Sequence, residues 1–204
     1  MSDPTPANAL SDPGSDPRRA AILGAAFEVF RQYGFRRTSM EDIARAAGLS
    51  RASLYLHYRN KQDIFRSLVR HYFDATEKRV RAALAPGLAP EDALGAVFAA
   101  KAGPEMEAMF ASPHGEDLLD ANFSTSADIV KEGEERIAML LADWMIHEDA
   151  AGRLRLEAFD DDAQALARTM IAALTGIKAP AQGIEAFRAG AQRLAQLFGR
   201  ALAR

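Results

Sequence analysis

The sequence predicts an all-α protein. Alanine and leucine, which favour helices, are abundant, and the β-branched residues that favour strands are sparse. Apolar residues recur three and four positions apart in successive segments, and glycine or proline separates one segment from the next. With 204 residues, 49% of them apolar, the chain is long enough to bury the core of one large domain or two small ones.

Residues 1–17 differ from the rest of the chain. The tripeptide Ser-Asp-Pro occurs three times, beginning at Ser2, Ser11 and Ser15. Proline removes backbone donors, and few residues here are apolar enough to bury. We therefore predict a disordered tail over 1–17.

Helical periodicity continues from residue 18 to the end of the chain. Glycine and proline set most of the boundaries, and three consecutive aspartates at 160–162 favour a helix start. The segment 115–148 forms either two helices, 115–130 and 131–148, or one helix with a bend near Gly133. The other predicted helices cover 18–33, 39–47, 51–58, 61–85, 90–102, 104–111, 160–176 and 184–203.

The two short helices between residues 38 and 58 have the form of a helix-turn-helix. Thr38 or Ser39 caps the first helix, with an acidic residue three positions on as its capping-box partner. Gly48 permits a tight turn, and Ser50 and Asn60 cap the helices that follow. Leu49, Leu54 and Tyr58 anchor the second helix inward. Its outward residues are then Arg51, Ala52, Ser53, Tyr55, Leu56 and His57.

Charge is unevenly distributed along the chain. The net charge is −3 overall, but residues 15–61 hold nine basic and four acidic side chains, whereas residues 62–204 carry a net charge of −6. A basic head on an acidic body suggests that the head meets a polyanion, although chance clustering on a solvated surface remains an alternative.

The stretch TSMEDIARAAGLSRASLYLHYRNKQDIF, residues 38–65, resembles the DNA-binding signature of TetR-family regulators. The matching features are the Thr-Ser cap, the pair Ile43-Ala44, the run 47–50, the segment 54–58 and Lys61. The resemblance is strong over about 18–65 and depends on length and helix pattern beyond. One departure is Tyr58, where the family often has phenylalanine, so its hydroxyl needs a partner.

The resemblance implies DNA contacts for nine residues. Tyr55, His57 and Lys61 match positions that usually touch phosphates, and Thr38 and Ser39 join them through hydroxyls and helix amides. Arg51 and Ser53 match base-edge readers, while Ala52 and Leu56 meet thymine methyls. The alternative roles are structural: Tyr55 packs on the surface, Lys61 is solvated, and the serines act only as caps.

The resemblance also implies a homodimer, since one short helix reads too few bases. We predict an interface through about 160–177 and 184–203, although these faces could instead pack on their own subunit. The apolar residues concerned are Leu166, Met170, Ile171, Leu174, Ile177, Ile184, Phe187, Ala191, Leu194, Leu197, Phe198 and Leu202.

We predict a helix-turn-helix DNA-binding domain over 18–62 and a helical bundle for ligand binding and dimerisation over 63–204. Its methionine and aromatic residues either enclose a pocket for a small apolar or amphipathic effector or form an ordinary core. His114, Glu116, Asp117 and Asn122 either orient a ligand or cap a helix. The candidate ligand contacts are Tyr72, Phe98, Met106, Phe110, Phe123 and Trp144.

Other function classes find little support. The chain has no cysteine, phosphate-binding glycine loop, nucleophile elbow or His-x-x-x-His pair, so we expect no catalytic residue, no cofactor and no metal. No apolar run is long enough to span a membrane, and the composition suits the cytoplasm. The sequence therefore predicts a ligand-responsive repressor with a roughly palindromic double-stranded DNA operator, or alternatively a constitutive, architectural DNA-binding dimer without an effector.

Overall fold

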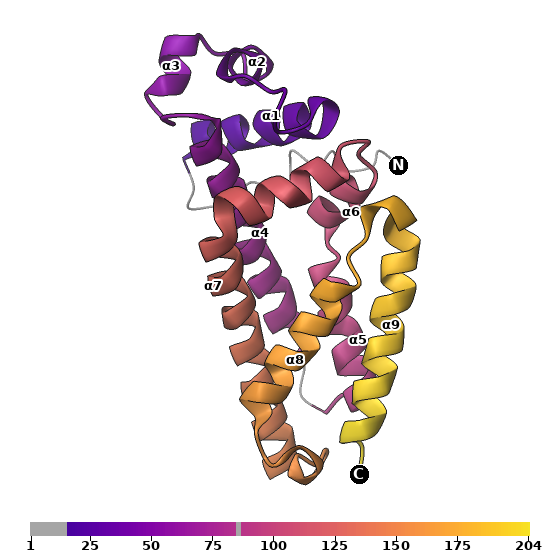
Figure 1. The fold of residues 1–204 in the computed structure, drawn as a ribbon. Helices are drawn as coiled ribbons and strands as arrows, with labels where there is room; N and C mark the ends of the chain where they lie inside the picture. Colours follow the sequence, from indigo (N-terminus) through magenta and orange to yellow (C-terminus); the bar gives the residue numbers. More distant parts are fainter. Residues whose placement is uncertain (1–15, 85–86) are drawn as a thin grey trace, which may run out of the picture. The chain divides into compact units, whose positions relative to one another are not determined.

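The computed structural model describes residues 16–84 and 87–204, apart from the side chains of residues 122 and 123. Within these ranges the regular secondary structure is helical, which confirms the predicted all-α class (Figure 1). The predicted tail lies outside the described residues except at its end, where Asp16 caps the first helix and Pro17 begins it.

The chain divides into two compact units. The described part of unit 1 comprises residues 16–72 and 104–130, and unit 2 comprises 73–103 and 131–204, without residues 85–86. Two helices, α4 (Lys61–Ala83) and α7 (Gly115–Ala150), contribute to both units. The segment 104–130 thus joins the helix-turn-helix segment in one unit.

Unit 1 contains α1 (Pro17–Tyr33), α2 (Met40–Ala46), α3 (Arg51–Tyr55), α6 (Pro104–Phe110) and the first parts of α4 and α7. Three of these helices start as predicted. Ser39 and Asp42 form the capping box of α2, Ser50 caps α3, and the side-chain oxygen of Asn60 accepts from the Asp63 amide at 2.8 Å at the start of α4.

An aromatic cluster lies at the centre of unit 1. The rings of Phe30, Phe35 and Phe65 meet with centroid distances of 5.0–5.6 Å in tilted and edge-to-face arrangements. Ile43 from α2 and Leu54 from α3 are fully buried as well. Each short helix is therefore fixed to the unit by its own apolar anchor.

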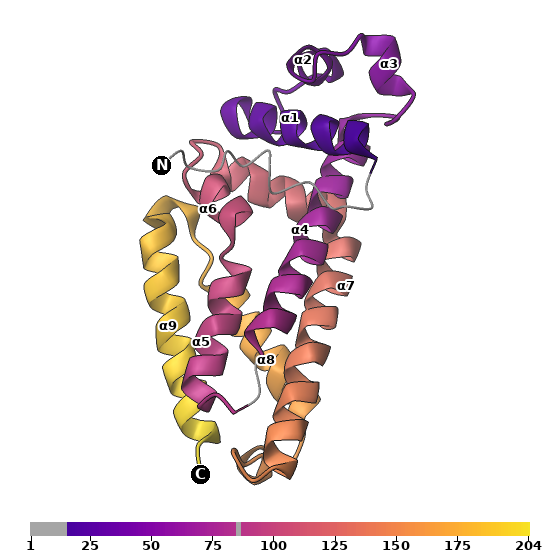
Figure 2. The same cartoon turned by 180° about the vertical axis from the view of Figure 1, so that it is seen from behind.

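Unit 2 contains α5 (Pro90–Lys101), α8 (Ala163–Gly176), α9 (Gly183–Leu202), the remaining parts of α4 and α7, and 3₁₀ turns at 157–159 and 180–182. Helices α5 and α9 lie side by side in both views (Figures 1 and 2). Gly199 makes this approach possible, because a Cβ there would lie 2.6 Å from the backbone nitrogen of Glu91.

The bend in α7 lies at Ser126, not at Gly133 as the sequence suggested. Ser126 has φ −138° and ψ 19° inside an otherwise continuous helix. The Thr125 hydroxyl donates to the Ala121 carbonyl at 2.7 Å, and such side-chain bonds compete with the backbone ladder. Gly133 instead gives room to a neighbour, because a Cβ there would lie 2.2 Å from Cγ of Phe73.

Two of the three consecutive aspartates precede α8 instead of opening it. Asp160 and Asp161 adopt left-handed φ values of 54° and 58°. Asp162 alone caps the helix, accepting from the Ala165 amide at 2.9 Å. Short polar side chains tolerate this backbone conformation, which explains why aspartates occupy the turn.

The apolar residues expected at a dimer interface lie largely in the chain's own core. Leu166, Met170, Ile171 and Leu174 of α8 are buried within the described structure, which corrects their assignment to an interface. Phe187, Ala191 and Leu202 of α9 are buried too, and the other α9 residues are half-buried except Leu197, which is 67% exposed. Only the outward faces of α8 and α9 are therefore available to contact a second subunit.

Candidate nucleic-acid interface

Helix α3 is short and held at both its start and its inner face. The Ser50 hydroxyl accepts from the Ser53 amide at 3.0 Å, and the two hydroxyl oxygens lie 2.8 Å apart. Gly48 adopts φ 66° in the preceding turn, as the tight connection requires. Leu54 anchors the helix from inside. Ser50 therefore acts as a cap and engages the Ser53 side chain.

The outward face of α3 presents a leucine and a cation–aromatic pair. Leu56 is 85% exposed, and Tyr55 is also largely exposed. The Arg51 guanidinium lies over the Tyr55 ring, 5.7 Å from its centroid, and Ala52 is exposed beside it. A leucine this exposed gains nothing from the chain's own core, so this face has the chemistry of a contact surface.

The remaining predicted contacts on α3 and α2 differ in access. Ser53 and His57 are half-buried, and Ser39 is exposed at the start of α2. Thr38 is only 2% exposed, and its hydroxyl donates to the Gly34 carbonyl at 2.7 Å. In this structure Thr38 therefore closes the α1–α2 turn instead of facing outward, which departs from its predicted phosphate contact.

Tyr58, where the sequence departs from phenylalanine, lies in the core of unit 1. The ring is buried, and the Arg19 guanidinium lies 5.8 Å from its centroid. Burial raises the pKa of Tyr58, while Arg19 and Ser67 oppose that shift. Tyr58 is thus a core residue close in sequence to the end of α3.

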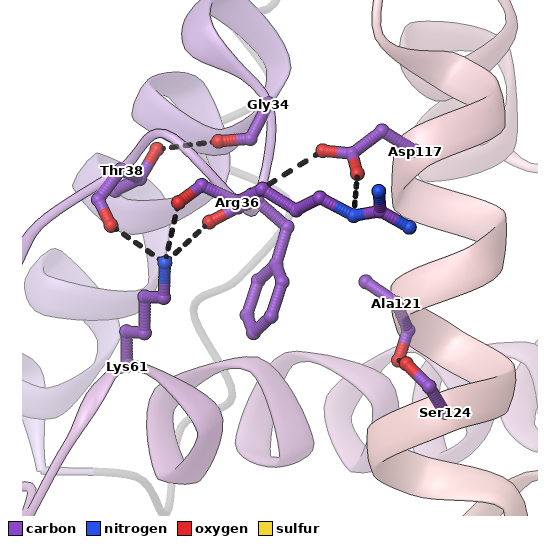
Figure 3. Close-up of polar contacts among 8 residues, drawn as sticks. Gly34, Arg36, Thr38, Lys61, Asp117, Ala121 and Ser124 are labelled. Atoms are coloured by element: carbon purple, nitrogen blue, oxygen red, sulfur yellow. Dashed lines mark hydrogen bonds and ion pairs between the residues drawn. The ribbon is translucent and has the colours of Figure 1, made fainter.

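Lys61 braces the α1–α2 turn from the first position of α4 (Figure 3). Its ammonium group donates to the carbonyls of Phe35, Arg36 and Thr38 at 2.8, 2.9 and 2.9 Å. Burial lowers the pKa of Lys61, and the charge of Asp117 opposes that shift. An ammonium has three donors. A phosphate would have to displace one of these carbonyls, so the structure gives Lys61 a role that the sequence did not suggest.

The segment around the start of α7 holds the other side of the same turn. The Arg36 guanidinium pairs with Asp117 at 3.3 Å (Figure 3), and the Ser112 hydroxyl donates to the Arg31 carbonyl at 2.7 Å. Gly34 has φ 82°, and a Cβ there would lie 2.8 Å from Oδ2 of Asp117. Asp117, predicted either to orient a ligand or to cap a helix, therefore contacts the turn that leads into the helix-turn-helix.

A second ion pair joins α4 to α7 within unit 1. Arg66 donates to both carboxylate oxygens of Asp128 at 2.7 and 2.6 Å and to the Thr125 carbonyl at 2.7 Å. The bond from Arg66 lowers the pKa of Asp128 to about 2. No sequence signal pointed to this pair, because its members are 62 positions apart.

The candidate ligand contacts are divided between the two units. Tyr72, Met106 and Phe110 belong to unit 1, whereas Phe98 and Trp144 belong to unit 2. All except the half-buried Tyr72 are buried, as core residues are. The side chain of Phe123 lies outside the described residues, and so does that of Asn122. Within the described ranges, no three histidine, aspartate or glutamate side chains gather as metal ligands, and no helix is long and apolar enough to cross a bilayer.

Comparison with known proteins finds a family model that matches one segment of this chain. Residues 22–68, which cover α1 to the first part of α4, match the model of bacterial regulatory proteins of the tetR family. Residues 22–68 are therefore similar to that family, and α3 lies within the matched segment.

Curated relatives match only part of this chain. Over 73 residues the chain is 40% identical to YezE of Bacillus subtilis, named as an HTH-type transcriptional regulator, which covers 35% of this chain and 38% of that protein. Over 84 residues it is 34% identical to the HTH-type transcriptional repressor KstR2 of Rhodococcus jostii, covering 41% of each. The chain thus matches about two fifths of each relative's length.

The fold extends the likeness to the whole chain. A transcriptional regulator from Cytophaga hutchinsonii superimposes with a TM-score of 0.73 at 16% identity, covering 93% of this chain and all of that one. At this identity the likeness shows the fold alone. The chain therefore shares the helical fold of that structure over nearly its whole length.

Proposed function

We propose that this protein is a transcriptional regulator that binds operator DNA as a homodimer and acts as a repressor released by a small effector. The observation that carries DNA binding is the exposed face of α3, where Arg51, Tyr55 and Leu56 stand outward on a helix fixed by Ser50 and Leu54. Arginine reads guanine, and an aliphatic side chain suits a thymine methyl. Relatives named as regulators, one of them a repressor, support the same assignment.

Dimerisation is part of the proposal because α3 has only five residues. One such helix reaches too few base pairs for selectivity, and a two-fold axis doubles the site. We place the interface on α8 and α9, over about 160–177 and 184–203. Their outward faces include Ala165, Thr169 and Ala172 of α8 and the exposed Leu197 of α9.

Selection from a random duplex library, followed by affinity measurements on the selected and a random sequence, tests DNA binding. We expect a roughly palindromic site whose half-sites lie on one face of the duplex, ~34–36 Å or a multiple of that spacing apart. Arg51→Ala should lose about 1–3 kcal/mol on the selected site and little on random DNA. Arg155→Ala removes an exposed arginine of unit 2 and serves as the matched control.

Two results would contradict the proposal. If the protein is monomeric at micromolar concentration and does not retard duplex DNA in a gel at low salt, it neither dimerises nor binds DNA as proposed. Equal losses on both duplexes for Arg51→Ala would remove the base-reading role of α3. A reporter gene behind the selected site tests the sign, since a repressor lowers its expression and an activator raises it.

Effector control is tested by reciprocity. A ligand that releases DNA must bind the free protein more tightly than the operator complex, by the same factor that it weakens DNA binding. That factor corresponds to a coupling of about 1–3 kcal/mol. Identical dissociation constants with and without operator, for every ligand found, would favour a constitutive DNA-binding protein.

A further inference from the structure

Arg51 and Tyr55 are the first and the last residue of α3. Both residues are exposed, and the Arg51 guanidinium carbon lies over the Tyr55 ring, 5.7 Å from its centroid. We propose that Tyr55 is a positioning residue for base reading, whose ring holds the Arg51 guanidinium ready to bind a base edge. This inference rests on the proposed function, because it requires that α3 reads DNA through Arg51.

The helix geometry brings the two side chains together. Residues four positions apart lie on the same face of a helix, and a side chain leans over the turn that precedes its own Cα. The Tyr55 ring therefore leans over the turn to which Arg51 belongs. The pKa of Arg51 is raised, chiefly by Tyr55 and further by the charge of Glu41. This effect agrees with the ring contact in identifying Tyr55 as the neighbour that acts most strongly on Arg51.

Tyr55 has the rigid support that a positioning residue needs. It directly follows Leu54, whose side chain is fully buried, and the helix is capped by Ser50. A tyrosine has two side-chain torsions, whereas an arginine is long and flexible and loses much conformational freedom when it is fixed. The ring therefore lowers the entropic cost of ordering Arg51 when the arginine meets a base.

The kind of partner distinguishes Arg51 from other arginines of unit 1. Arg66 donates to both carboxylate oxygens of Asp128. Arg36 pairs with Asp117. A carboxylate takes up the N–H edge of a guanidinium, and that edge is the one that binds O6 and N7 of guanine. An aromatic ring interacts with the cation through its π-face and leaves N–H donors for the base. Arg51 can therefore be held and still donate to DNA.

Positioning and phosphate binding give different expectations for Tyr55. A phosphate contact acts through the hydroxyl and does not depend on the base sequence or on Arg51. Positioning acts through the ring, and only on the base pair that Arg51 reads. The two roles are therefore separated by one variant that keeps the ring without the hydroxyl and one that removes the ring.

Fluorescence anisotropy of the full chain, with the selected duplex and its single-base-pair variants, tests the proposal. The position at which Arg51→Ala loses the wild-type preference is the base pair that Arg51 reads. At that pair we expect Tyr55→Leu to reduce the preference about three- to tenfold, because it removes a cation–π contact that DNA shields from water. Preferences at the other positions, and the affinity for a random duplex, should stay within about twofold of wild type.

Controls show whether the effect belongs to the ring and to Arg51. Tyr55→Phe keeps the ring and should retain the wild-type preference. In the Arg51→Ala background, Tyr55→Leu should change the preference at that base pair no further, because the ring then has no guanidinium to hold. Tyr33→Leu removes a tyrosine of similar exposure, 49% against 44%, at the end of α1 in the same unit, and should alter no preference.

The folding of the variants is monitored by their affinity for the random duplex and by their melting temperatures. Because Tyr55 is exposed, Tyr55→Leu should stay folded, and Tyr55→Met provides a second aliphatic variant with the same expected loss.

Four results would overturn the positioning role. The aliphatic variants keep the wild-type preference at that base pair; they weaken the selected and random duplexes equally; Tyr55→Phe loses as much as Tyr55→Leu; or the loss persists without Arg51. The first two of these results, with Arg51→Ala still relaxing its base pair, refute positioning alone. A wild type that binds no duplex, or an Arg51→Ala variant that relaxes no base pair, refutes base reading by α3 and positioning with it.

Discussion

Replacing Lys61 with methionine tests whether this lysine stabilises the α1–α2 turn or binds a DNA phosphate. The substitution keeps most of the aliphatic stem and removes the ammonium that donates to the carbonyls of Phe35, Arg36 and Thr38. Bonds from a charged donor contribute about 1.5–3 kcal/mol each when buried. Two of the three are only partly buried and the third is exposed, so solvent screening reduces their sum.

We expect Lys61→Met to lower the free energy of unfolding by about 1–3 kcal/mol, or roughly 2–10 °C in the melting temperature of a chain of this size. Differential scanning calorimetry measures the loss. Arg59→Ala removes an exposed charge two residues earlier and should change stability by less than about 0.5 kcal/mol.

The salt dependence of binding to a random duplex separates the two roles. A lysine that neutralises a phosphate contributes about 0.9 to the slope of log affinity against log salt. A bracing lysine contributes little to that slope, so we expect Lys61→Met to keep it. Wild-type stability combined with a slope shallower by about one would refute the bracing role and restore the phosphate contact.

Four further substitutions test the packing of unit 1. Gly34→Ala should lower the free energy of unfolding in urea by about 2–4 kcal/mol, because φ is 82° and the added Cβ would meet the Asp117 side chain. Gly48→Ala, at φ 66° with open space around the Cβ, is the control and should lower it by only about 1–2 kcal/mol. Equal losses for the two variants would exclude the steric effect of Asp117. The pKa of Asp128 is lowered from 3.8 to about 2, so its carboxylate stabilises the fold fully above pH 4 and progressively less as the pH falls to 2. The free energy of unfolding of Asp128→Asn, measured against pH, should lack this decrease between pH 4 and 2. Tyr58→Phe should lower the free energy of unfolding by about 1 kcal/mol or less at neutral pH. Because the pKa of Tyr58 is raised in the folded protein, its ionisation above pH 10 favours the unfolded chain, so the wild type should lose stability there. Tyr58→Phe should lack that loss in unfolding curves measured against pH.

The helices of the head were predictable because their signals are local. Ser39 with Asp42, Ser50 and Asn60 each mark a helix start within three or four residues, and Gly48 marks the turn between two of them. These signals depend on neighbouring residues alone, so the sequence pattern carries them in full.

Roles that depend on distant residues were not predictable. Lys61 resembles a surface donor in the sequence, but the carbonyls of the turn at 35–38, between 23 and 26 positions earlier, accept its hydrogen bonds. Thr38 was misjudged for a local reason, since its hydroxyl donates to the Gly34 carbonyl only four positions earlier. The apolar stripe of α8 fits either a dimer interface or a core, and periodicity cannot distinguish them, because both bury one helix face. The structure identifies that stripe as core.

The burial of Lys101, which is 1% exposed at the end of α5, could have been predicted from the sequence but was not. It occupies an apolar face of α5, one turn after Phe98, in a helix whose other charged residues in the sequence are at its start. A lone lysine at such a position is rare in a core unless it is paired or functional. The bend of α7 had a weaker signal, since the run of serine and threonine at 124–126 competes with Gly133 as its cause.

The local helix starts of the head also affect the order in which the chain folds. Contacts between near neighbours form quickly because little chain entropy is lost in closing them. Arg36 and Arg66, by contrast, pair with Asp117 and Asp128, which are 81 and 62 positions further along. During synthesis from the N-terminus, α1 to α3 have all their caps and anchors before either aspartate exists. We therefore expect the head to fold early on the ribosome, and the start of α7 to lock onto an already formed turn.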